Sequence, residues 1–533
     1  MQKIGIMQPT RLFTAGIQDF ADIRERNLVY IDKTDIVYKL TQESKFIFLS
    51  RPRRFGKTLL CTTLRYYFEG RKELFQGLAM EKLETEWKKY PVLHFNLSLC
   101  KNQYNLQGIT NELERQLRRF ENEYGRDLND DTPGARFASL MERAYRQTGL
   151  KCVVILDEYD APLLDVLDEP EKLAEVRKIM QEFYQPLKAC EEFEHFVFIT
   201  GITKFSQLSI FSTLNNITNI TMLPQYSAIC GITVDEALDV FKPDIQVLAD
   251  EYKCTYNEMV DKLKAKYDGY NFCEKSKDIF NPFSLTMALK NRKIDSYWFG
   301  SGTPTYLFEQ MKRFGTNVLS LENITASASE FDAPTENMET ILPLLYQSGY
   351  LTIKDYNFDT NQYVLDFPNA EVRVGFMRNL LPVVAAKAST LLATNTIASI
   401  YTSLLKQDID SALQSIKAFL ASVPYLEHGN SKLGNLTTLE AFYETVMYVI
   451  FSMMNNYVRT QVKSANGRSD IVMFVKDTVY VFELKINGTA QEALDQINSK
   501  GYMLPYEAGN KKVVKVGVAF SKETRTIEDW IVE

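Results

Sequence analysis

The sequence is poor in the residues that build metal clusters and disulfide frameworks. It contains 3 histidines, His94, His195 and His428, and each of them is isolated in the sequence. Its 7 cysteines form no C-x-x-C pair, and none of them follows Cys273. These absences exclude a clustered Cys/His zinc site and an H-E-x-x-H metalloprotease. An odd, scattered set of cysteines also predicts reduced thiols in a reducing compartment.

Long apolar runs are absent too. No stretch reaches the roughly 18 apolar residues that a membrane-spanning helix needs. Residues 1–16 carry Lys3 and Arg11 but lack the apolar core of a signal peptide. We therefore expect a cytoplasmic protein that has no membrane partner.

The chain has no surplus of basic charge. Its 61 Lys and Arg residues stand against 68 Asp and Glu residues, which gives a net charge of -7. A chain-wide basic coat is thereby excluded, so contacts with nucleic acid must come from local patches. With 533 residues, 45% of them hydrophobic, the chain is long enough for three or four domains that each bury a core.

Short apolar runs alternate with helical patterns in the first part of the chain. Continuous apolar strands that alternate with helices favour an α/β fold, with a parallel sheet covered by helices on both faces. The strands are predicted at Phe46–Ser50, Val92–Leu97, Cys152–Asp157 and Phe196–Thr200, and the helices at Lys57–Glu69, Leu106–Tyr124, Pro133–Thr148 and Pro170–Leu187.

The remainder of the chain is predicted to be helical and then α/β again. A helix over Glu336–Ser348, followed by a hairpin of Tyr350–Ile353 and Tyr363–Phe367, is typical of a winged helix. The helical stretch Leu392–Phe419 indicates a connector, and the C-terminal part reads as helix, three strands and helix. The predicted domains are 1–232 (P-loop domain), 233–390 (helical and winged-helix region), 391–435 (connector) and 436–533 (C-terminal α/β domain).

A phosphate-binding loop is predicted directly after the first strand. Strand, loop, Gly-Lys-Thr and helix follow in the order that such a loop requires. Lys57 would reach the β- and γ-phosphates of ATP, and the Thr58 hydroxyl would ligate Mg²⁺. Arg51 replaces the first glycine of the usual motif, and Gly-Lys-Thr alone also fits a plain basic helix start. The nucleotide-binding loop comprises Arg51, Pro52, Arg53, Arg54, Phe55, Gly56, Lys57 and Thr58.

Two further strand ends carry polar residues suited to ATP chemistry. The strand Cys152–Asp157 ends in Asp157 and Glu158. Asp157 would hold the Mg²⁺ ion, and Glu158 would orient the attacking water. Thr200, at the end of the strand Phe196–Thr200, would sense the γ-phosphate. Alternatively, these are an acidic strand end facing solvent and an ordinary strand-end threonine.

A separate constellation near the C-terminus predicts a phosphodiesterase. Asp470 opens one strand of a hairpin, while Glu483 and Lys485, two residues apart, share a face of the other strand. Asp470 and Glu483 would bind Mg²⁺ or Mn²⁺, and Lys485 would position the attacking water. Glu444 on the preceding helix and Gln496 on the following helix would support the site.

These motifs together resemble the bacterial AAA-ATPase-like family, whose members usually carry a C-terminal PD-(D/E)XK nuclease domain. In that family an Arg-Pro-Arg-Arg-Phe loop replaces the glycine-rich one. The resemblance implies ATP binding, and it matches the nuclease motif residue by residue at Asp470, Glu483 and Lys485. Glu444 and Gln496 match its supporting positions. Further matching segments are 30–34, 156–160, 266–270, 281–284, 302–305, 349–352 and 367–372.

Two functions of different classes follow. The first is an ATP-regulated, metal-dependent nuclease, with DNA favoured over RNA as substrate. The second is a nucleotide-dependent switch whose nuclease-like domain only binds nucleic acid or a partner; a transcriptional regulator is a weaker third option. A homo-oligomer is compatible with each. From Ser431 to Glu533 the chain carries 12 basic and 12 acidic residues, so we expect DNA to be presented by a basic cluster elsewhere, of Arg51, Arg53, Arg54, Arg65, Arg71 and Lys72.

Overall fold

The computed structural model divides the chain into two compact units. The first comprises Met1–Trp298, Thr325–Met338 and Leu342–Asn369, and the second comprises Phe299–Ile324, Glu339–Ile341 and Ala370–Glu533. None of the described helices is long and apolar enough to cross a membrane. The structure describes residues 11–101, 106–167, 169–204, 217–301, 305–335, 338–384, 390–422, 439–454, 457–464, 467–507 and 511–533.

The first unit is built on a parallel sheet, which confirms the predicted α/β class. Its strand order is β2-β3-β4-β1-β5. All neighbouring strands are parallel, so the carboxyl ends of β1, β3 and β4 lie at one edge of the sheet. The strands are β1 (Phe46–Ser50), β2 (Val92–Asn96), β3 (Cys152–Asp157), β4 (Glu194–Gly201) and β5 (Thr218–Asn219).

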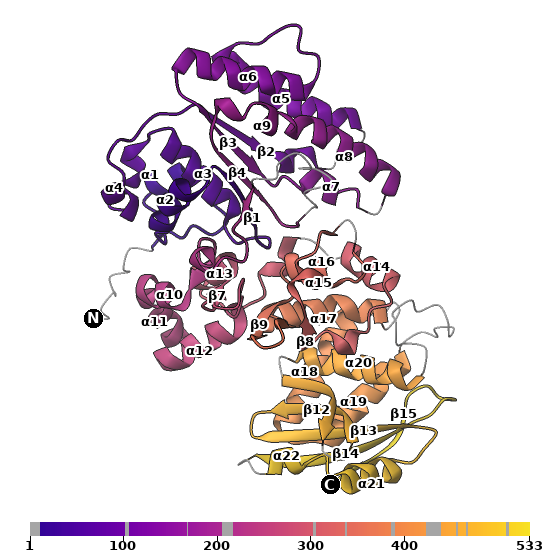
Figure 1. The fold of residues 1–533 in the computed structure, drawn as a ribbon. Helices are drawn as coiled ribbons and strands as arrows, with labels where there is room; N and C mark the ends of the chain where they lie inside the picture. Colours follow the sequence, from indigo (N-terminus) through magenta and orange to yellow (C-terminus); the bar gives the residue numbers. More distant parts are fainter. Residues whose placement is uncertain are drawn as a thin grey trace, which may run out of the picture. The chain divides into compact units, whose positions relative to one another are not determined.

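Helices cover both faces of this sheet, as predicted. Figure 1 shows α3 with α1, α2 and α4 on one side and α5, α6 and α8 on the other. The predicted helix Pro170–Leu187 is interrupted near Gln185, because Pro186 has no N–H to continue it. The helices are α1 (Phe20–Glu25), α2 (Thr34–Glu43), α3 (Lys57–Phe68), α4 (Ala79–Leu83), α5 (Leu106–Tyr124), α6 (Pro133–Thr148), α7 (Ala161–Leu164), α8 (Pro170–Tyr184) and α9 (Pro186–Ala189).

A helical group completes the core of the first unit. The predicted hairpin forms from β9 (Thr352–Asn357) and β10 (Gln362–Asp366), with β8 (Ile324–Ala326) as a third strand. The helix before it, α16 (Leu342–Gln347), is shorter than predicted, because Pro343 favours a helix start at that point. The other elements are β6 (Ile232–Thr233), α10 (Val234–Val240), α11 (Lys242–Glu251), α12 (Tyr256–Tyr267), β7 (Ile279–Phe280), α13 (Pro282–Asn291) and α15 (Ala328–Phe331).

The second unit combines helices with a mixed sheet. The sheet has five strands in the order β11-β12-β13-β14-β15, two more than predicted, and only β13 and β14 are parallel neighbours. The strands are β11 (Tyr457–Ser464), β12 (Gly467–Val475), β13 (Thr478–Ile486), β14 (Lys512–Phe520) and β15 (Ile527–Val532). The helices are α14 (Thr305–Arg313), α17 (Ala370–Val384), α18 (Thr390–Leu405), α19 (Ile409–Ser422), α20 (Leu439–Met453), α21 (Ala490–Lys500) and α22 (Leu504–Glu507).

The predicted connector helix Leu392–Phe419 is divided into α18 and α19. Gln407 adopts the left-handed conformation at φ +59° between them. The Asp408 carboxylate then accepts a hydrogen bond from the Ser411 amide at 3.0 Å, which caps the start of α19. The last part of the predicted connector, 423–435, lies outside the described residues. The domain boundaries drawn from the sequence stay predictions.

Candidate active sites

The loop between β1 and α3 has the geometry of a phosphate-binding turn. Gly56 caps α3 at φ +90°, a conformation that favours glycine, and α3 begins at Lys57. The buried Lys57 ammonium donates to the carbonyl oxygens of Arg51 and Pro52, at 2.9 Å each. Burial lowers the pKa of Lys57, while the carboxylates of Glu158 and its neighbours oppose that shift. The ammonium is therefore held against the loop at the N-terminus of a helix, where phosphate binds.

Arg51 anchors the base of this loop. Its side chain is 1% exposed, and its guanidinium donates to the carbonyl oxygens of Ser50 at 3.0 Å and Thr221 at 2.8 Å. It also donates to the carbonyl oxygen of Tyr226 at 3.2 Å. The buried Arg51 side chain thus fixes the base of the loop. The expectation that Arg51 takes part in a basic surface for DNA is therefore wrong.

Aromatic residues from the helical group hold the tip of the loop. Phe55 lies 4.8 Å from the ring of Tyr270 and 5.3 Å from the ring of Phe272, edge to face with both. The Arg51 guanidinium also lies 4.1 Å above Phe272. The Arg54 guanidinium lies 3.8 Å above the ring of Phe283 at the start of α13. These contacts fix the loop from outside the sheet. Segments 266–270 and 281–284 were part of the family pattern, but their role as supports of the loop was not predicted from the sequence.

Removing one of these rings is expected to weaken nucleotide binding indirectly. Phe272→Ala deletes the surface under both Arg51 and Phe55, and we expect the Kd for ATP to rise about tenfold, because roughly 1.4 kcal/mol of loop positioning is lost. Binding of a fluorescent ATP analogue measures the effect. Phe358→Ala is the matched control, because Phe358 is 65% exposed. If Phe272→Ala and Phe358→Ala bind ATP with equal affinity, the aromatic contacts of the loop do not contribute to nucleotide binding.

Asp157 ends β3 in a position suited to a metal ion. Its side chain is completely buried, and neither carboxylate oxygen accepts a hydrogen bond of normal geometry, although the Thr58 hydroxyl and the Glu158 amide lie close. Burial raises its pKa to about 6, against the opposing effects of Thr58 and Lys57. A buried carboxylate without well-aligned donors is normally compensated by a cation. Asp157 and the nearby Thr58 hydroxyl therefore fit a Mg²⁺ ion that accompanies ATP.

Glu158 follows Asp157 in a strained conformation. Its φ is +50°, in the left-handed region that few non-glycine residues adopt, and such strain is concentrated at functional sites. The Glu158 carboxylate pairs with the Lys101 ammonium at 3.0 Å, and both side chains are about one-quarter exposed, at 28% and 26%. Sequence reasoning missed Lys101, because a lone lysine after β2 carries no local signal. The pair holds the Glu158 carboxylate in one orientation.

The end of β4 is tied to the neighbouring strands by hydrogen bonds. The Thr200 hydroxyl donates to the carbonyl oxygen of Leu49 at 2.7 Å, which links β4 to β1. The buried Asp160 carboxylate accepts from the amide of Ile202 at 3.0 Å and from the amide and hydroxyl of Thr203 at 2.7 Å each. Thr200 therefore has a structural bond, and the predicted γ-phosphate sensing stays a prediction.

The second candidate site lies on the β12–β13 hairpin. A two-residue turn joins the strands, since Val475 pairs with Thr478, and Ile471 pairs with Phe482 at the other end. Asp470 directly precedes Ile471 and Glu483 directly follows Phe482, and an oxygen of Asp470 accepts from the amide of Leu484 at 2.8 Å. The structure therefore brings the two predicted carboxylates together at one end of the hairpin.

Glu483, Lys485 and Gln496 form one hydrogen-bonded cluster. The Lys485 ammonium lies 3.3 Å from Glu483 Oε1 and donates to Gln496 Oε1 at 2.6 Å. The Gln496 amide on α21 donates to the same Glu483 oxygen. Glu483 Oε2 is buried and lacks a hydrogen-bond partner. Glu444 is also buried, on α20, which packs against β12 and β13. The arrangement leaves one carboxylate oxygen of Glu483 for a cation, so the residues fit a divalent metal.

Metal binding at this site is expected to depend on pH. Burial, and next the charge of Asp470, raise the pKa of Glu483 to about 7. Since only the carboxylate binds a cation, Mn²⁺ affinity should increase as the pH rises through 7 and level off above it. Calorimetric titration of Mn²⁺ between about pH 6 and pH 8 measures this. Glu483→Gln should lose the dependence, while the exposed Asp495→Asn should keep it; an unchanged profile in Glu483→Gln would exclude Glu483 as its source.

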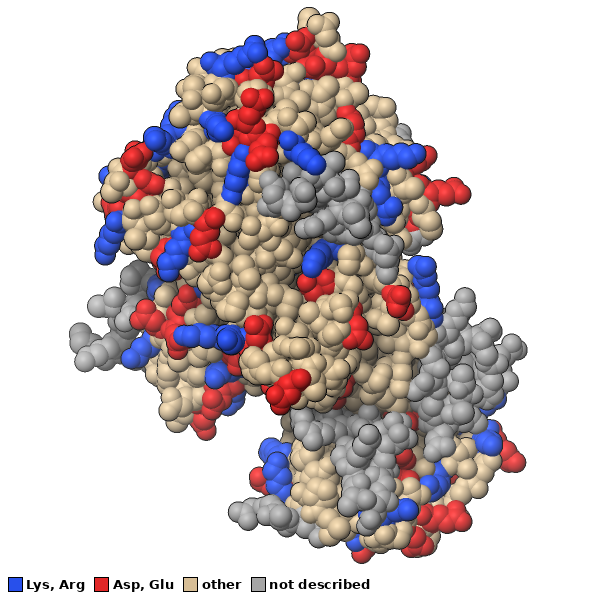
Figure 2. Space-filling view, viewed as in Figure 1, with Lys and Arg blue, Asp and Glu red and all other residues tan. Residues whose placement is uncertain are grey.

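Half of the predicted basic cluster around the loop is paired or buried. Arg65 pairs with Glu69 at 2.7 Å, Arg71 pairs with Glu73, and Arg51 is buried. On the face that Figure 2 shows, basic and acidic side chains are interspersed without a broad patch of one sign. A substrate groove built from the whole cluster is therefore not supported, although Arg53 and Lys72 remain exposed.

The fold and the two sites define a P-loop protein that carries a second, nuclease-like domain. Comparisons agree with this class. The family described as "Predicted AAA-ATPase" matches residues 14–211, and the PD-(D/E)XK nuclease superfamily matches residues 438–530. The chain belongs to the AAA-ATPase-like family with a C-terminal PD-(D/E)XK nuclease superfamily domain.

One relative matches this chain over nearly its whole length. A protein of Azotobacter chroococcum mcd 1, named "Uncharacterized protein in vnfD 5'region", is 32% identical over 526 residues, 97% of this chain and 98% of its own. The solved structure of the Aeropyrum pernix ORC1 protein in complex with DNA aligns at 10% identity with a TM-score of 0.22, over 65% of this chain and 92% of that one. At that score the alignment supports no argument.

Proposed function

We propose that the protein is an ATP-binding, ATP-hydrolysing regulator of its own metal-dependent nuclease domain, which cleaves nucleic acid. The observation that carries the nuclease assignment is the cluster of Glu483, Lys485 and Gln496 beside Asp470. Its composition, a carboxylate and an ammonium in hydrogen-bonding distance with a second carboxylate on the paired strand, is suited to phosphodiester hydrolysis. The neutral charge of the domain makes a sequence-independent grip on a bare duplex weak.

Each residue of the cluster has a definite task in this proposal. Asp470 and Glu483 would hold Mg²⁺ or Mn²⁺, which supplies a Lewis acid at the scissile phosphate. Gln496 orients the Lys485 ammonium and Glu483 through its two hydrogen bonds. Lys485 then fixes the direction of the attacking water and stabilises charge on the phosphate oxygens.

The nucleotide site has a matching set of tasks. Lys57 exchanges its bonds to the loop carbonyls for the β- and γ-phosphates of ATP, and its charge offsets theirs. Thr58 and Asp157 would hold Mg²⁺, which neutralises charge between the phosphates. Glu158 orients the attacking water, and Lys101 keeps that carboxylate in place until the site is filled.

Cleavage assays on the purified full-length chain test the nuclease assignment. End-labelled DNA and RNA, single- and double-stranded, are incubated with Mg²⁺ or Mn²⁺, and we expect cleavage of DNA that is abolished by chelation. Cleavage retained by Asp470→Ala would identify a contaminating nuclease. Absence of cleavage from every substrate, with metal binding intact, would favour the alternative, a nucleotide-dependent switch whose nuclease-like domain only binds.

A further inference from the structure

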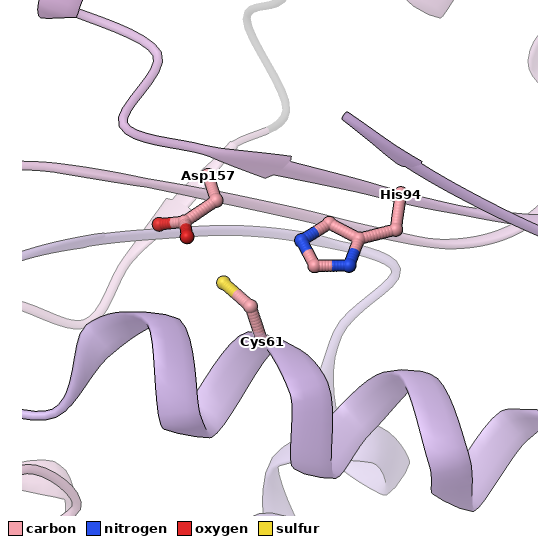
Figure 3. A group of neighbouring side chains, drawn as sticks. All are labelled: Cys61, His94 and Asp157. Atoms are coloured by element: carbon pink, nitrogen blue, oxygen red, sulfur yellow. The ribbon is translucent and has the colours of Figure 1, made fainter. Parts of the chain in front are cut away.

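Three potential metal ligands converge beneath the nucleotide site, although they are far apart in the sequence. Cys61 lies on α3, His94 on β2 and Asp157 at the end of β3 (Figure 3). Their ligand atoms all lie within 4.8 Å of one another. The isolation of each histidine excludes a cluster of neighbouring Cys and His residues, but it does not exclude a site assembled by the fold.

The polar atoms of this group are poorly satisfied by the protein. His94 Nε2 is buried without a hydrogen-bond partner, and both carboxylate oxygens of Asp157 are buried and accept no hydrogen bond of normal geometry. Buried polar atoms are nearly always paired, so several unpaired ones facing a common point need an explanation. Figure 3 shows the Cys61 sulfur and the edge of the His94 ring both directed toward the Asp157 side. A cation at their centre would satisfy all three side chains.

The donor types select the class of cation. Thiolate and imidazole are the ligands of zinc-class ions, whereas Mg²⁺ prefers oxygen ligands. We propose that Cys61, His94 and Asp157 bind a zinc-class divalent cation, with Zn²⁺ as the physiological candidate. Bond lengths of about 2.0–2.3 Å require the side chains to close slightly around the ion. On binding, the Cys61 thiol gives its proton to solvent and coordinates as the thiolate, and the fourth position stays open.

This site shares Asp157 with the proposed Mg²⁺ site, which gives it a regulatory consequence. Two divalent cations on one carboxylate repel each other and compete for its charge, so zinc and Mg·ATP should weaken each other's binding. Because linkage is reciprocal, ATP with Mg²⁺ must lower zinc affinity by the factor by which zinc lowers Mg·ATP affinity. The metal site stands without the proposed function, whereas this antagonism rests on it.

Cobalt provides a direct spectroscopic test. The full-length protein, freed of metal by chelation, is titrated with Co²⁺, which replaces Zn²⁺ and reports thiolate ligation by a near-ultraviolet charge-transfer band. We expect that band in the wild type, its displacement by added Zn²⁺, and its loss in Cys61→Ser. Cys100→Ser is the matched control, because Cys100 is also buried in the first unit. In His94→Asn the charge-transfer band should be weaker than in the wild type, and the ligand-field bands of Co²⁺ should shift.

Each outcome decides one part of the proposal. The metal site would be wrong if the wild type shows no charge-transfer band, or if Cys61→Ser shows the same band as the wild type. Cys61 would then be a buried thiol beside a carboxylate. If Cys61→Ser does not fold, the ligand-field shift in His94→Asn decides. If the cobalt band is unaffected by Mg·ATP in protein that binds the nucleotide, the metal site stands and the antagonism is wrong.

Discussion

Lys57→Ala is expected to raise the Kd for ATP by about 10²-fold or more. The substitution removes the only ammonium that lies against the carbonyl oxygens of Arg51 and Pro52 among the described residues, and charge-assisted bonds to phosphate contribute roughly 1.5–3 kcal/mol each. Equilibrium binding of a fluorescent ATP analogue measures the change. Lys72→Ala, which removes an exposed lysine of the same unit, should bind as the wild type does.

The neighbouring carboxylate separates binding from hydrolysis. Glu158→Gln keeps the size of the side chain and a polar contact with Lys101, but an amide cannot accept a proton from water. We expect ATP affinity to stay within a few-fold and hydrolysis to fall by about 10²-fold or more. Wild-type affinity in Lys57→Ala would refute the phosphate-loop assignment, and wild-type turnover in Glu158→Gln would remove that residue from the reaction.

Asp470→Ala and Glu483→Ala are each expected to abolish cleavage while ATP binding remains. Each removes a carboxylate from the proposed metal site, so Mn²⁺ affinity measured by calorimetry should fall together with the cleavage rate. Lys485→Ala should retain the metal and slow cleavage by about 10²-fold, the usual effect of losing an electrostatic catalytic group. Asp495→Asn, on the exposed side of α21, is the control for changes near Gln496.

Thermal unfolding distinguishes a lost ligand from a lost fold. The pKa of Glu483 is raised to about 7, so its native carboxyl binds a proton more tightly than the unfolded one does. Without metal, this contribution to stability is therefore lost as the pH rises from about 4.5 to about 7. Glu483→Gln should have a Tm at pH 8 in chelator equal to or above that of the wild type. A marked decrease would mean that its loss of cleavage reflects unfolding.

The elements set by local patterns were predictable from the sequence. The buried runs of β1 and β3 and the amphipathic helices α5 and α6 have the predicted bounds, because apolar periodicity and caps such as Thr132 define them locally. The predicted helix Glu336–Ser348 was too long, since periodicity alone does not place its start at Leu342. Strands β14 and β15 were missed, because the predicted order of helix, three strands and helix ends at α21, whereas these two strands follow it and pair with β13 and with each other.

The motifs of the two sites were predictable from the sequence, but the residues that hold those motifs in place were not. Gly56, Lys57, Asp470, Glu483 and Lys485 follow from spacing and strand pairing, which are local. The burial of the Arg51 side chain, the pairing of Lys101 with Glu158 and the convergence of Cys61 with Asp157 depend on contacts between distant segments. Such contacts leave no signature in a single sequence, and the roles of all these residues stay predictions until they are measured.

The dependence of cleavage on nucleotide tests the central claim most directly. The rate at which the full-length protein cleaves DNA with Mn²⁺ is measured while ATP is titrated, for the wild type and for Lys57→Ala. The account predicts that ATP changes the wild-type rate several-fold, with a midpoint at the Kd for ATP, and leaves the rate of Lys57→Ala unchanged. A cleavage rate independent of ATP in the wild type, or the same response in both proteins, would contradict it.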